Sequence, residues 1–582
     1  MPEDGRATMA APRRSMRVLP AEKRWALAVA TGFMVILGLP YVLAWVSTPA
    51  DGVFMGHIWN PDDPCVYMAW ARQAADGRLF LQDLFTTEAQ NGRYTNLFFL
   101  AIGWIARVSG LSIGTVYAGS RIVCGVALLY TTYLAAAAFS SRLVVRRLAV
   151  YLVATASGLG WLYRLVDLTW PGRFGNVACV DIAYTGGQGD AITLAMPELV
   201  PAMSLLLHPH FALSMSLLLV SVVWGGRAFG GGRRRDALAA GVAAFLLGNI
   251  HTYDAIPTAL ALLVLAVLAW LQDRGRWRSI CTSLATIALL ALPPVAYQTY
   301  VFQVDAVFRQ KALTVTASPS VLSYVVSMGL PLLAAAAGSA FALRCRRRRW
   351  HPLVAWAVVA CAIPFLPGLS FQRKMVEGAY LPLCLLTAWI VAECAIPALH
   401  RRLRRRGRRA RLQAAARVVV LMTVAACVPS LGVFTQRALS TVTDNNRSRH
   451  LPPYYMARDD VACMAWLGGS EGPRITPDAV VLLSPLSAAY LPGIAGCKVY
   501  AGHWAETLDY SRKVAEVAAV LSGRLRQDQA RRFVEASGAR WLLWGAVERA
   551  VFGEPDAFLA AVPHRLAHQE GKTAVYELLL GR

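Results

Sequence analysis

Long apolar stretches recur along the first three quarters of the chain, separated by short polar or basic segments. A helix needs about 20 predominantly apolar residues to cross roughly 30 Å of hydrocarbon. The pattern therefore predicts an α-helical polytopic membrane protein with about 11 transmembrane helices. The predicted spans lie near 25–47, 119–140, 147–165, 197–224, 236–250, 254–272, 279–302, 320–343, 351–368, 379–398 and 416–436.

The last quarter of the chain follows another pattern. Short β-like runs at 479–485, 540–545 and 573–580 alternate with helical stretches at 511–524 and 527–538. This alternation predicts a small C-terminal α/β domain. The predicted division is an N-terminal tail over 1–24, a transmembrane module over 25–437 and a soluble domain over 438–582.

Composition and charge agree with a membrane protein. Apolar residues make up 56% of the 582 residues and charged residues only 16%, and the net charge is +24. The N-terminal tail and every second loop are basic, and together they hold 30 of the 58 Lys and Arg residues. Cytoplasmic loops collect such residues, so the charge is explained by topology and no nucleic-acid partner is expected. We predict a multi-pass protein of the cell (inner or plasma) membrane with a cytoplasmic N-terminus and an extracytoplasmic C-terminal domain.

The first predicted extracytoplasmic loop, 48–118, contains the segment NPDDPCVYMAWARQAADG (60–77). Its acidic pair, Asp62 and Asp63, follows Pro61 and precedes a helical pattern with an apolar face. The pair is thus expected at a helix N-terminus, where backbone N–H groups favour ionised carboxylates. A fixed carboxylate beside the lipid headgroups suits a general base for a lipid-borne substrate. Capping of the helix is the alternative.

The acidic pair, Tyr67, Ala71 with Arg72, and Gly77 resemble the first loop of GT-C superfamily polytopic glycosyltransferases, which use polyprenyl-phosphate sugars as donors. The segment 95–112 is similar to the amphipathic juxtamembrane helix of that superfamily. The segment 118–139 is similar to its second spanning helix, with Arg121 at the outer end. The resemblance implies a GT-C-like fold, an Asp in this loop that deprotonates the acceptor hydroxyl, and sugar transfer with inversion.

Which aspartate is the base stays open at this point. Members similar to protein O-mannosyltransferases carry Asp-Glu, with Tyr four residues after the Asp. Asp63 has this spacing to Tyr67, whereas Asp62 has the acidic neighbour. We slightly favour Asp62.

Cations are needed to stabilise a phosphate leaving group. Arg373 and Lys374, in the segment 370–383, are predicted in an outer turn between two spans. Their alternative role is to anchor the turn at the headgroups. Arg121 and His251 are further candidates for binding the donor phosphate.

Several ionisable residues are predicted at membrane depth, where such groups usually face a cavity or a partner. They are His208, His210, His251 and Asp254. Contact with donor or acceptor, structural hydrogen bonding and a metal site are the possible roles. The metal signal is weak, so no metal ligand and no cofactor are predicted; a divalent ion is permitted but not required.

Acceptor or sugar binding is assigned to polar and aromatic residues of the first loop, the spans and the tail. The set is Tyr67, Glu88, His208, His210, Asp254, His503, Trp504 and Glu506. Packing within the tail domain is the alternative for the last three. Two disulfides, Cys65–Cys179 and Cys463–Cys497, are further hypotheses.

The sequence therefore favours an inverting hexosyl- or pentosyltransferase. It would move a sugar from a polyprenyl-phosphate donor in the lipid bilayer to a glycan, lipid or protein acceptor on the extracytoplasmic face. The alternative is a transporter or flippase of lipid-linked saccharides. A structural or assembly protein with a binding tail is a third class.

Overall fold

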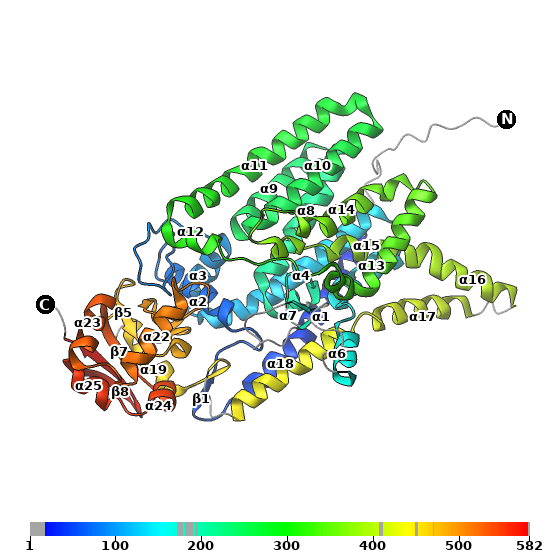
Figure 1. Cartoon of the computed structure of the whole chain (residues 1–582). Coiled ribbons are helices and arrows are strands. Elements are labelled where there is room, and N and C mark those ends of the chain that lie inside the picture. Colours follow the sequence, from blue (N-terminus) through cyan, green and yellow to red (C-terminus); the bar gives the residue numbers. More distant parts are fainter. Residues whose placement is uncertain are drawn as a thin grey trace, which may run out of the picture. The chain divides into compact units, whose positions relative to one another are not determined.

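The structure is a computed structural model that describes residues 18–170, 179–180, 190–191, 196–231, 233–406, 411–447, 452–469 and 471–579. The chain forms two compact units (Figure 1). The first contains the described residues of 1–38, 121–297 and 315–436, and the second those of 39–120, 298–314 and 437–582. Each unit is described by itself below.

Apolar helices dominate the first part of the chain and the first unit. The principal ones are α1 (Pro20–Val46), α4 (Ile113–Phe139), α5 (Leu143–Thr155), α6 (Gly160–Thr169), α7 (Pro201–Leu207), α8 (Pro209–Phe229), α9 (Arg234–Ile250), α10 (Ala255–Gln272), α11 (Trp277–Val304), α13 (Val321–Arg344), α14 (His351–Ala362), α15 (Tyr380–Ile390), α16 (Ile396–Arg405), α17 (Leu412–Ala425) and α18 (Pro429–Arg447). Short 3-10 turns η2 (Thr252–Asp254), η3 (Arg274–Arg276), η4 (Arg348–Trp350), η5 (Ile363–Phe365) and η6 (Gln372–Val376) and a π-helical turn η7 (Val391–Ala395) join them. A two-stranded pair, β2 (Cys179–Val180) and β3 (Asp190–Ala191), completes the unit.

Seven helical segments within the described residues are long and apolar enough to cross a membrane. The number rises to nine if each of two bent pairs, α5 with α6 and α17 with α18, is one span. Helix is present at all eleven predicted stretches, but α9 has 17 residues and α14 has 12, which is short for a span. The chain is therefore a multi-pass membrane protein, and the predicted count of about 11 is not confirmed.

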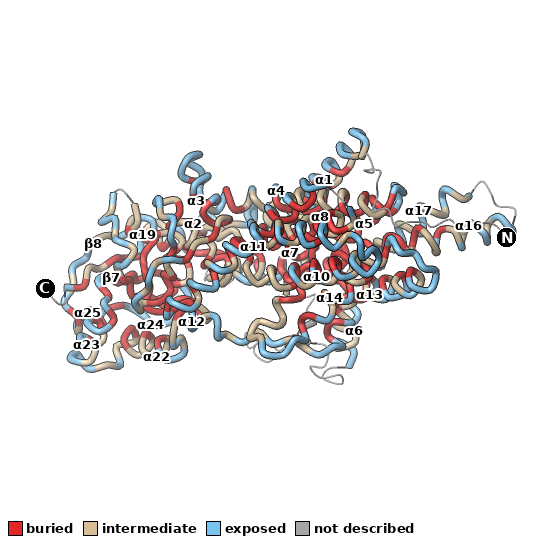
Figure 2. Tube along the Cα trace, turned by 90° about the horizontal axis from the view of Figure 1, so that it is seen from above, coloured by how far each residue is buried: buried red, intermediate tan, exposed pale blue. Residues whose placement is uncertain are grey.

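Helix α8 is largely enclosed by its neighbours. Most of its residues are buried, and it packs against α9 and α10 (Figure 2). Close approach is possible because Gly225 faces Leu262 of α10, where an added Cβ would lie 2.3 Å from a methyl carbon. Lipid-facing helices such as α11 instead expose large apolar side chains, including Leu289 and Leu292.

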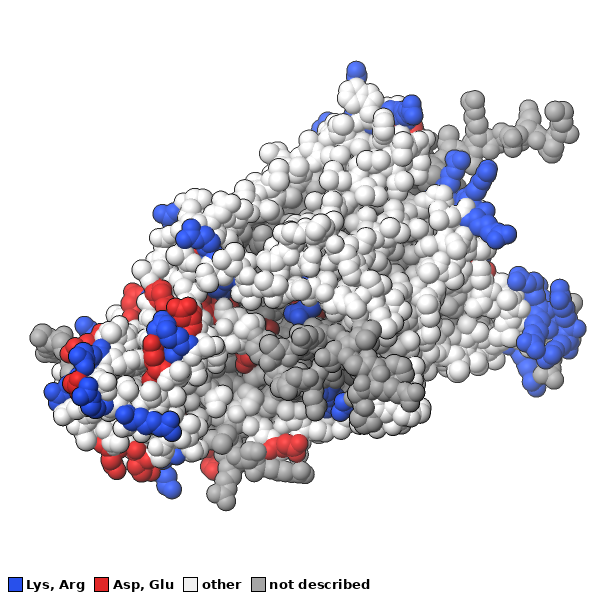
Figure 3. All heavy atoms as spheres, in the orientation of Figure 1, with Lys and Arg blue, Asp and Glu red and all other residues white. Residues whose placement is uncertain are grey.

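The α16 and α17 helices form a hairpin with a strongly basic end. Arg402, Arg404 and Arg405 lie in the last turn of α16, and His400 Nε2 lies 2.8 Å from the Leu412 carbonyl oxygen. Lys and Arg side chains gather over this end in Figure 3. The helix is therefore apolar at its start and basic at its end, as expected for a span that leaves the membrane.

The second unit is built on a five-stranded sheet of order β6-β5-β7-β9-β8 among the described strands. β5 pairs parallel with β6 and β7, whereas β9 pairs antiparallel with β7 and β8. The predicted runs at 479–485, 540–545 and 573–580 correspond to β5, β7 and β9, and the predicted helices to α22 and α23. The strands are β5 (Val480–Leu482), β6 (Lys498–Val499), β7 (Ala539–Trp544), β8 (His564–Glu570) and β9 (Thr573–Leu578), and the helices α19 (Arg458–Gly468), α20 (Pro485–Ala488), α21 (Leu491–Ala495), α22 (Tyr510–Leu521), α23 (Gln527–Ser537), α24 (Ala546–Phe552) and α25 (Asp556–Ala561).

The first loop packs onto this sheet domain. It contributes β1 (Gly52–Phe54), α2 (Asp62–Ala75) and α3 (Leu97–Ser109), and β1 pairs antiparallel with β4 (Tyr455–Ala457). The segment after α11 adds α12 (Ala306–Ala312). One apolar core joins the loop and the tail, because Cys65, Val66 and Phe85 are buried with Leu491 and Val499. The amphipathic helix expected over 95–112 is thus present as α3.

The expected Cys463–Cys497 disulfide is absent, because both residues are buried free thiols. Each is packed in the apolar core that the loop and tail share, where Cys463 Sγ instead contacts the Thr573 carbonyl oxygen at 3.5 Å. Cys65 is also a buried free thiol. The side chain of its expected partner, Cys179, lies outside those that the structure describes.

Candidate functional site

The acidic pair lies in the first turn of α2, as its position after Pro61 predicts. Asp63 accepts a hydrogen bond from Asn60 Nδ2 at 3.0 Å. Asp62 is half-buried and, among the described residues, makes no hydrogen bond or ion pair. The backbone N–H groups of the first turn stabilise negative charge on both side chains. Of the two carboxylates, only the Asp62 carboxylate has no hydrogen-bond or ion-pair partner among the described residues.

The Asp62 charge acts on three tyrosines of the tail. Burial raises the pKa of Tyr454 to about 12, and the Asp62 charge adds to this shift. Burial is the main cause that raises the pKa of Tyr490, and Cys65 and Asp62 add to this shift. Burial, followed by the Asp62 charge, also raises the pKa of Tyr510. The tyrosines therefore remain neutral phenols. An unpaired carboxylate beside neutral hydroxyl-bearing rings is a suitable environment for a polar acceptor.

The body of α2 is fixed by packing and by Arg72. The Arg72 guanidinium donates to Asp76 of the same helix, at 3.1 Å, and to the carbonyl oxygens of Ile494 and Gly468 in the tail. Tyr67 stacks on Phe99 of α3 with ring centroids 5.0 Å apart. The helix that holds Asp62 is thus anchored on two sides.

The other predicted residues of the second unit are mostly engaged in ion pairs or backbone contacts. Glu88 Oε1 lies 2.6 Å from Nζ of Lys513, which is buried. Glu506 pairs with Lys311. His503 is buried and its Nδ1 accepts from the N–H groups of Ala505 and Glu506, whereas its Nε2 has no hydrogen-bond partner among the described residues. Trp504 is half-buried beside it, with ring centroids 5.9 Å apart.

Asp83, Lys311 and Glu506 form a buried ionic group that the sequence reasoning missed. Asp83 Oδ2 lies 3.5 Å from Lys311 Nζ. Burial opposes the charge of all three groups, but Glu506 and Asp83 raise the pKa of Lys311, and Lys311 lowers that of Glu506. Burial raises the pKa of Asp83 to about 8. No sequence pattern indicates this ionic group, because its three residues come from separate segments of the sequence.

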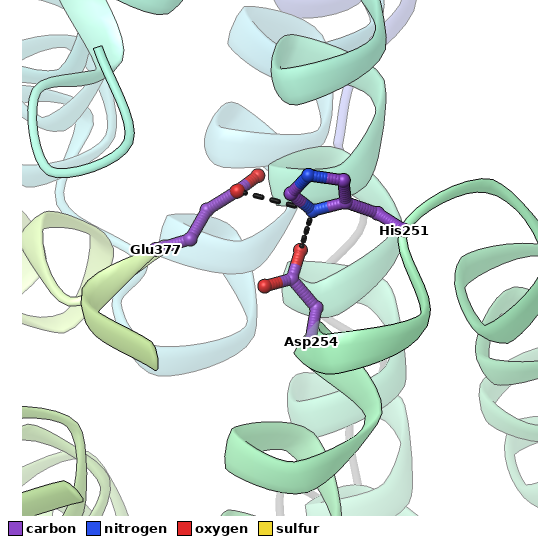
Figure 4. A group of neighbouring side chains, drawn as sticks. All are labelled: His251, Asp254 and Glu377. Carbon is purple, nitrogen blue, oxygen red and sulfur yellow. Dashed lines mark hydrogen bonds and ion pairs between the residues drawn. The ribbon is translucent and has the colours of Figure 1, made fainter. Parts of the chain in front are cut away.

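In the first unit, polar residues predicted at membrane depth come together. His251 follows α9, Asp254 ends η2 and Glu377 follows η6 (Figure 4). His251 Nδ1 lies 2.7 Å from Asp254 Oδ2 and 3.1 Å from Glu377 Oε2. The His210 ring is 5.9 Å from the His251 ring, and the His208 ring is 5.8 Å from that of His210. Glu377 was missed, although it is an acid inside a largely apolar segment.

The predicted phosphate-binding cations lie on two elements of the first unit. Arg373 and Lys374 are in η6, where Lys374 Nζ lies 5.1 Å from the Tyr253 ring centroid. Arg373 approaches Glu198 at 3.7 Å, and its buried Nε has no hydrogen-bond partner among the described residues. Arg121 was expected at the outer end of a span, but α4 begins at Ile113, so Arg121 lies about two turns inside the helix.

Comparison with protein-family models and with curated proteins finds no match. Among solved structures, the oligosaccharyltransferase AglB of Archaeoglobus fulgidus, in complex with an inhibitory peptide and a dolichol-phosphate, is 15% identical. The match covers 97% of this chain and 75% of that one, with a TM-score of 0.46. ArnT of Cupriavidus metallidurans, bound to undecaprenyl phosphate, is 15% identical over 94% of this chain and 98% of that one, also with a TM-score of 0.46.

Both of these structures hold a polyprenyl-type phosphate, dolichol-phosphate in one and undecaprenyl phosphate in the other. Similarity at this identity and TM-score assigns neither a site nor an activity to this chain.

Proposed function

We propose that the protein is an inverting glycosyltransferase of GT-C type that moves a sugar from a polyprenyl-phosphate donor to an acceptor on the extracytoplasmic face. One observation carries the proposal. Asp62 is held at the N-terminus of an anchored helix and has no hydrogen-bond or ion-pair partner among the described residues. A general base must be fixed and free to accept a proton, and Asp62 combines these properties better than Asp63.

The chemistry assigned to this carboxylate is a single displacement. Asp62 accepts the proton of the acceptor hydroxyl while the acceptor oxygen forms a bond to the anomeric carbon of the donor sugar. The bond between that carbon and the phosphate oxygen breaks, and polyprenyl phosphate leaves with the bonding electrons. Attack opposite the leaving group inverts the anomeric configuration. Because a phosphate leaves without a strong acid, one carboxylate for the acceptor and cations that bind the phosphate are sufficient.

We assign donor-phosphate binding to Arg373 and Lys374. The Arg373 ion pair with Glu198 is long, at 3.7 Å, and its Nε donor is unused among the described residues. An unused guanidinium donor can bind a phosphate oxygen, and the planar guanidinium favours two parallel hydrogen bonds. Arg121 is a secondary assignment, whereas both ring nitrogens of His251 are engaged, Nδ1 with Asp254 and Nε2 with Tyr253. In the second unit, the unused Nε2 of His503, beside Trp504, supports the assignment of an acceptor contact.

A flippase of lipid-linked saccharides is the second candidate, and one feature favours it. The helical segment over 201–229 is interrupted at His208, between α7 and α8. Interrupted helices with buried polar residues line the substrate sites of many transporters. This feature does not account for an unengaged carboxylate in the first loop.

Two measurements on the same protein separate these functions. Membranes containing the protein receive radiolabelled polyprenyl-phosphate sugar, and the label that leaves the lipid-linked fraction is counted. Purified protein in proteoliposomes is then tested for translocation of the same donor. Transfer that depends on the protein supports the glycosyltransferase, whereas translocation with no transfer contradicts it and supports the flippase.

A further inference from the structure

His251, Asp254 and Glu377 form a buried group in the first unit, here called the His251 triad. Their exposed fractions are 6%, 0% and 2%. Both carboxylates point at the same ring nitrogen in Figure 4. One oxygen or nitrogen atom from each residue lies within 4.8 Å of the other two. The three side chains thus converge on one point from two segments that are distant in the sequence.

Hydrogen bonding within the triad is incomplete. A ring nitrogen carries at most one proton, yet Nδ1 of His251 faces two carboxylates. Asp254 Oδ1 and Glu377 Oε1 are buried and have no hydrogen-bond partner among the described residues. Buried polar atoms are nearly always satisfied. These oxygens therefore point to a cation that bonds with several acceptors at once.

The net charge of the triad also indicates a bound cation. With both carboxylates ionised, an imidazolium leaves one negative charge in excess, and a neutral imidazole leaves two. Among the described residues, no cation other than His251 lies within ion-pair distance of Asp254 or Glu377. An unpaired buried charge is costly. A divalent ion with a neutral imidazole and two carboxylates makes the group electrically neutral.

The ligand types select a class of metal. Imidazole nitrogen suits Zn²⁺ and related transition ions, and carboxylate oxygen suits Mn²⁺ as well as Zn²⁺. The Tyr253 hydroxyl contacts Nε2 of His251, the ring nitrogen that does not face the carboxylates. A metal-bound histidine commonly donates its other N–H in this way, which fixes the ring and its tautomer.

We propose that Nδ1 of His251 and the carboxylates of Asp254 and Glu377 bind a divalent transition ion, Zn²⁺ or Mn²⁺. Ligand distances to the ion would be about 2.0–2.2 Å. Three protein ligands leave at least one coordination position for water. The site does not depend on the proposed transferase activity, because its existence rests only on these three side chains and their surroundings.

Metal content tests the proposal directly. The full chain is purified in detergent with a tag that contains no histidine, stripped with a chelator and dialysed separately against Zn²⁺ and Mn²⁺. Elemental analysis is expected to find one ion per chain for one or both metals. Asp254→Asn and Glu377→Gln should each weaken binding at least tenfold. Asp236→Asn is the control, since it removes a buried acid at the opposite end of α9 and should leave binding unchanged.

Two results would overturn the proposal: no bound ion in the wild type at either metal, or unchanged binding in both variants. If the variants do not fold, X-ray absorption of the metal-loaded wild type decides. One imidazole with oxygen ligands supports the site, whereas sulfur ligands or several imidazoles contradict it.

Discussion

Asp83 is the buried carboxyl whose protonation links the stability of the second unit to pH. Burial raises its pKa to about 8, well above the value near 4 of an unfolded chain. The folded state therefore holds a proton that the unfolded state has released. Its stabilising contribution is present in full below about pH 4 and is lost as the pH rises toward 8.

We expect the free energy of unfolding to fall between pH 6 and pH 8 by an amount on the order of 2 kcal/mol. Thermal unfolding of the purified protein in detergent at the two pH values measures this change. Asp83→Asn keeps the shape of the side chain and cannot ionise, so its unfolding should be less sensitive to pH. An equal loss of stability in the wild type and in Asp83→Asn would contradict the assignment.

The sequence could predict the positions and contacts of the site residues only where those residues are near one another in the chain. The helix-start position of Asp62 and Asp63 follows from Pro61 and the apolar pattern after it. The proximity of His251 to Asp254 follows from their spacing. The contacts of Glu377 with His251 and of Lys311 with Asp83 join distant segments, so no local pattern indicates them.

At the scale of elements, the contact between α2 and α3 fixes the direction of the helix that carries Asp62. Gly103 of α3 lies against α2, and a Cβ at this position would be 2.3 Å from the Ala71 carbonyl oxygen and 2.5 Å from Ala74 Cβ. Neither atom belongs to a flexible side chain. A side chain at position 103 must therefore push the helices apart.

We expect Gly103→Ala to destabilise the second unit by about 1–3 kcal/mol, the usual cost of overpacking. The midpoint of thermal unfolding should fall, and sugar transfer should fall with it because α2 is displaced. Gly119→Ala in α4 is the matched control, since nothing lies within 4 Å of its added Cβ. Equal unfolding midpoints for the two variants would show that α2 and α3 are not packed as described.

The elements themselves were largely predictable, and their boundaries were less so. Helix is found at every predicted apolar stretch, and three predicted strands of the tail are present as β5, β7 and β9. The span at 197–224 is broken at His208, where Pro209 begins the next helix. Hydrophobicity alone does not reveal such a break, because the residues on both sides are equally apolar. The packing of the first loop on the tail is also a long-range contact that local patterns cannot predict.

At the scale of the whole molecule, the distribution of Lys and Arg predicts a cytoplasmic N-terminus. Cys345 lies in the basic segment 344–350 and is exposed. A membrane-impermeant maleimide applied outside intact cells should therefore leave Cys345 unlabelled, and permeabilisation should expose it. Cys345→Ser identifies the signal, because the other exposed cysteine among those described is Cys281. Full labelling of Cys345 in intact cells would contradict the proposed orientation.

The central claim is that Asp62, and not its neighbour Asp63, is the general base of a transferase. Asp62→Asn and Asp63→Asn are nearly identical changes one residue apart in the same helical turn, so each controls for the other. The measurement is transfer of label from polyprenyl-phosphate sugar in membranes containing equal amounts of each protein. A general base contributes about 10²–10⁴-fold in rate. We expect a loss of this size for Asp62→Asn and a much smaller loss for Asp63→Asn. Parental transfer by Asp62→Asn would contradict the assignment of Asp62 as the base.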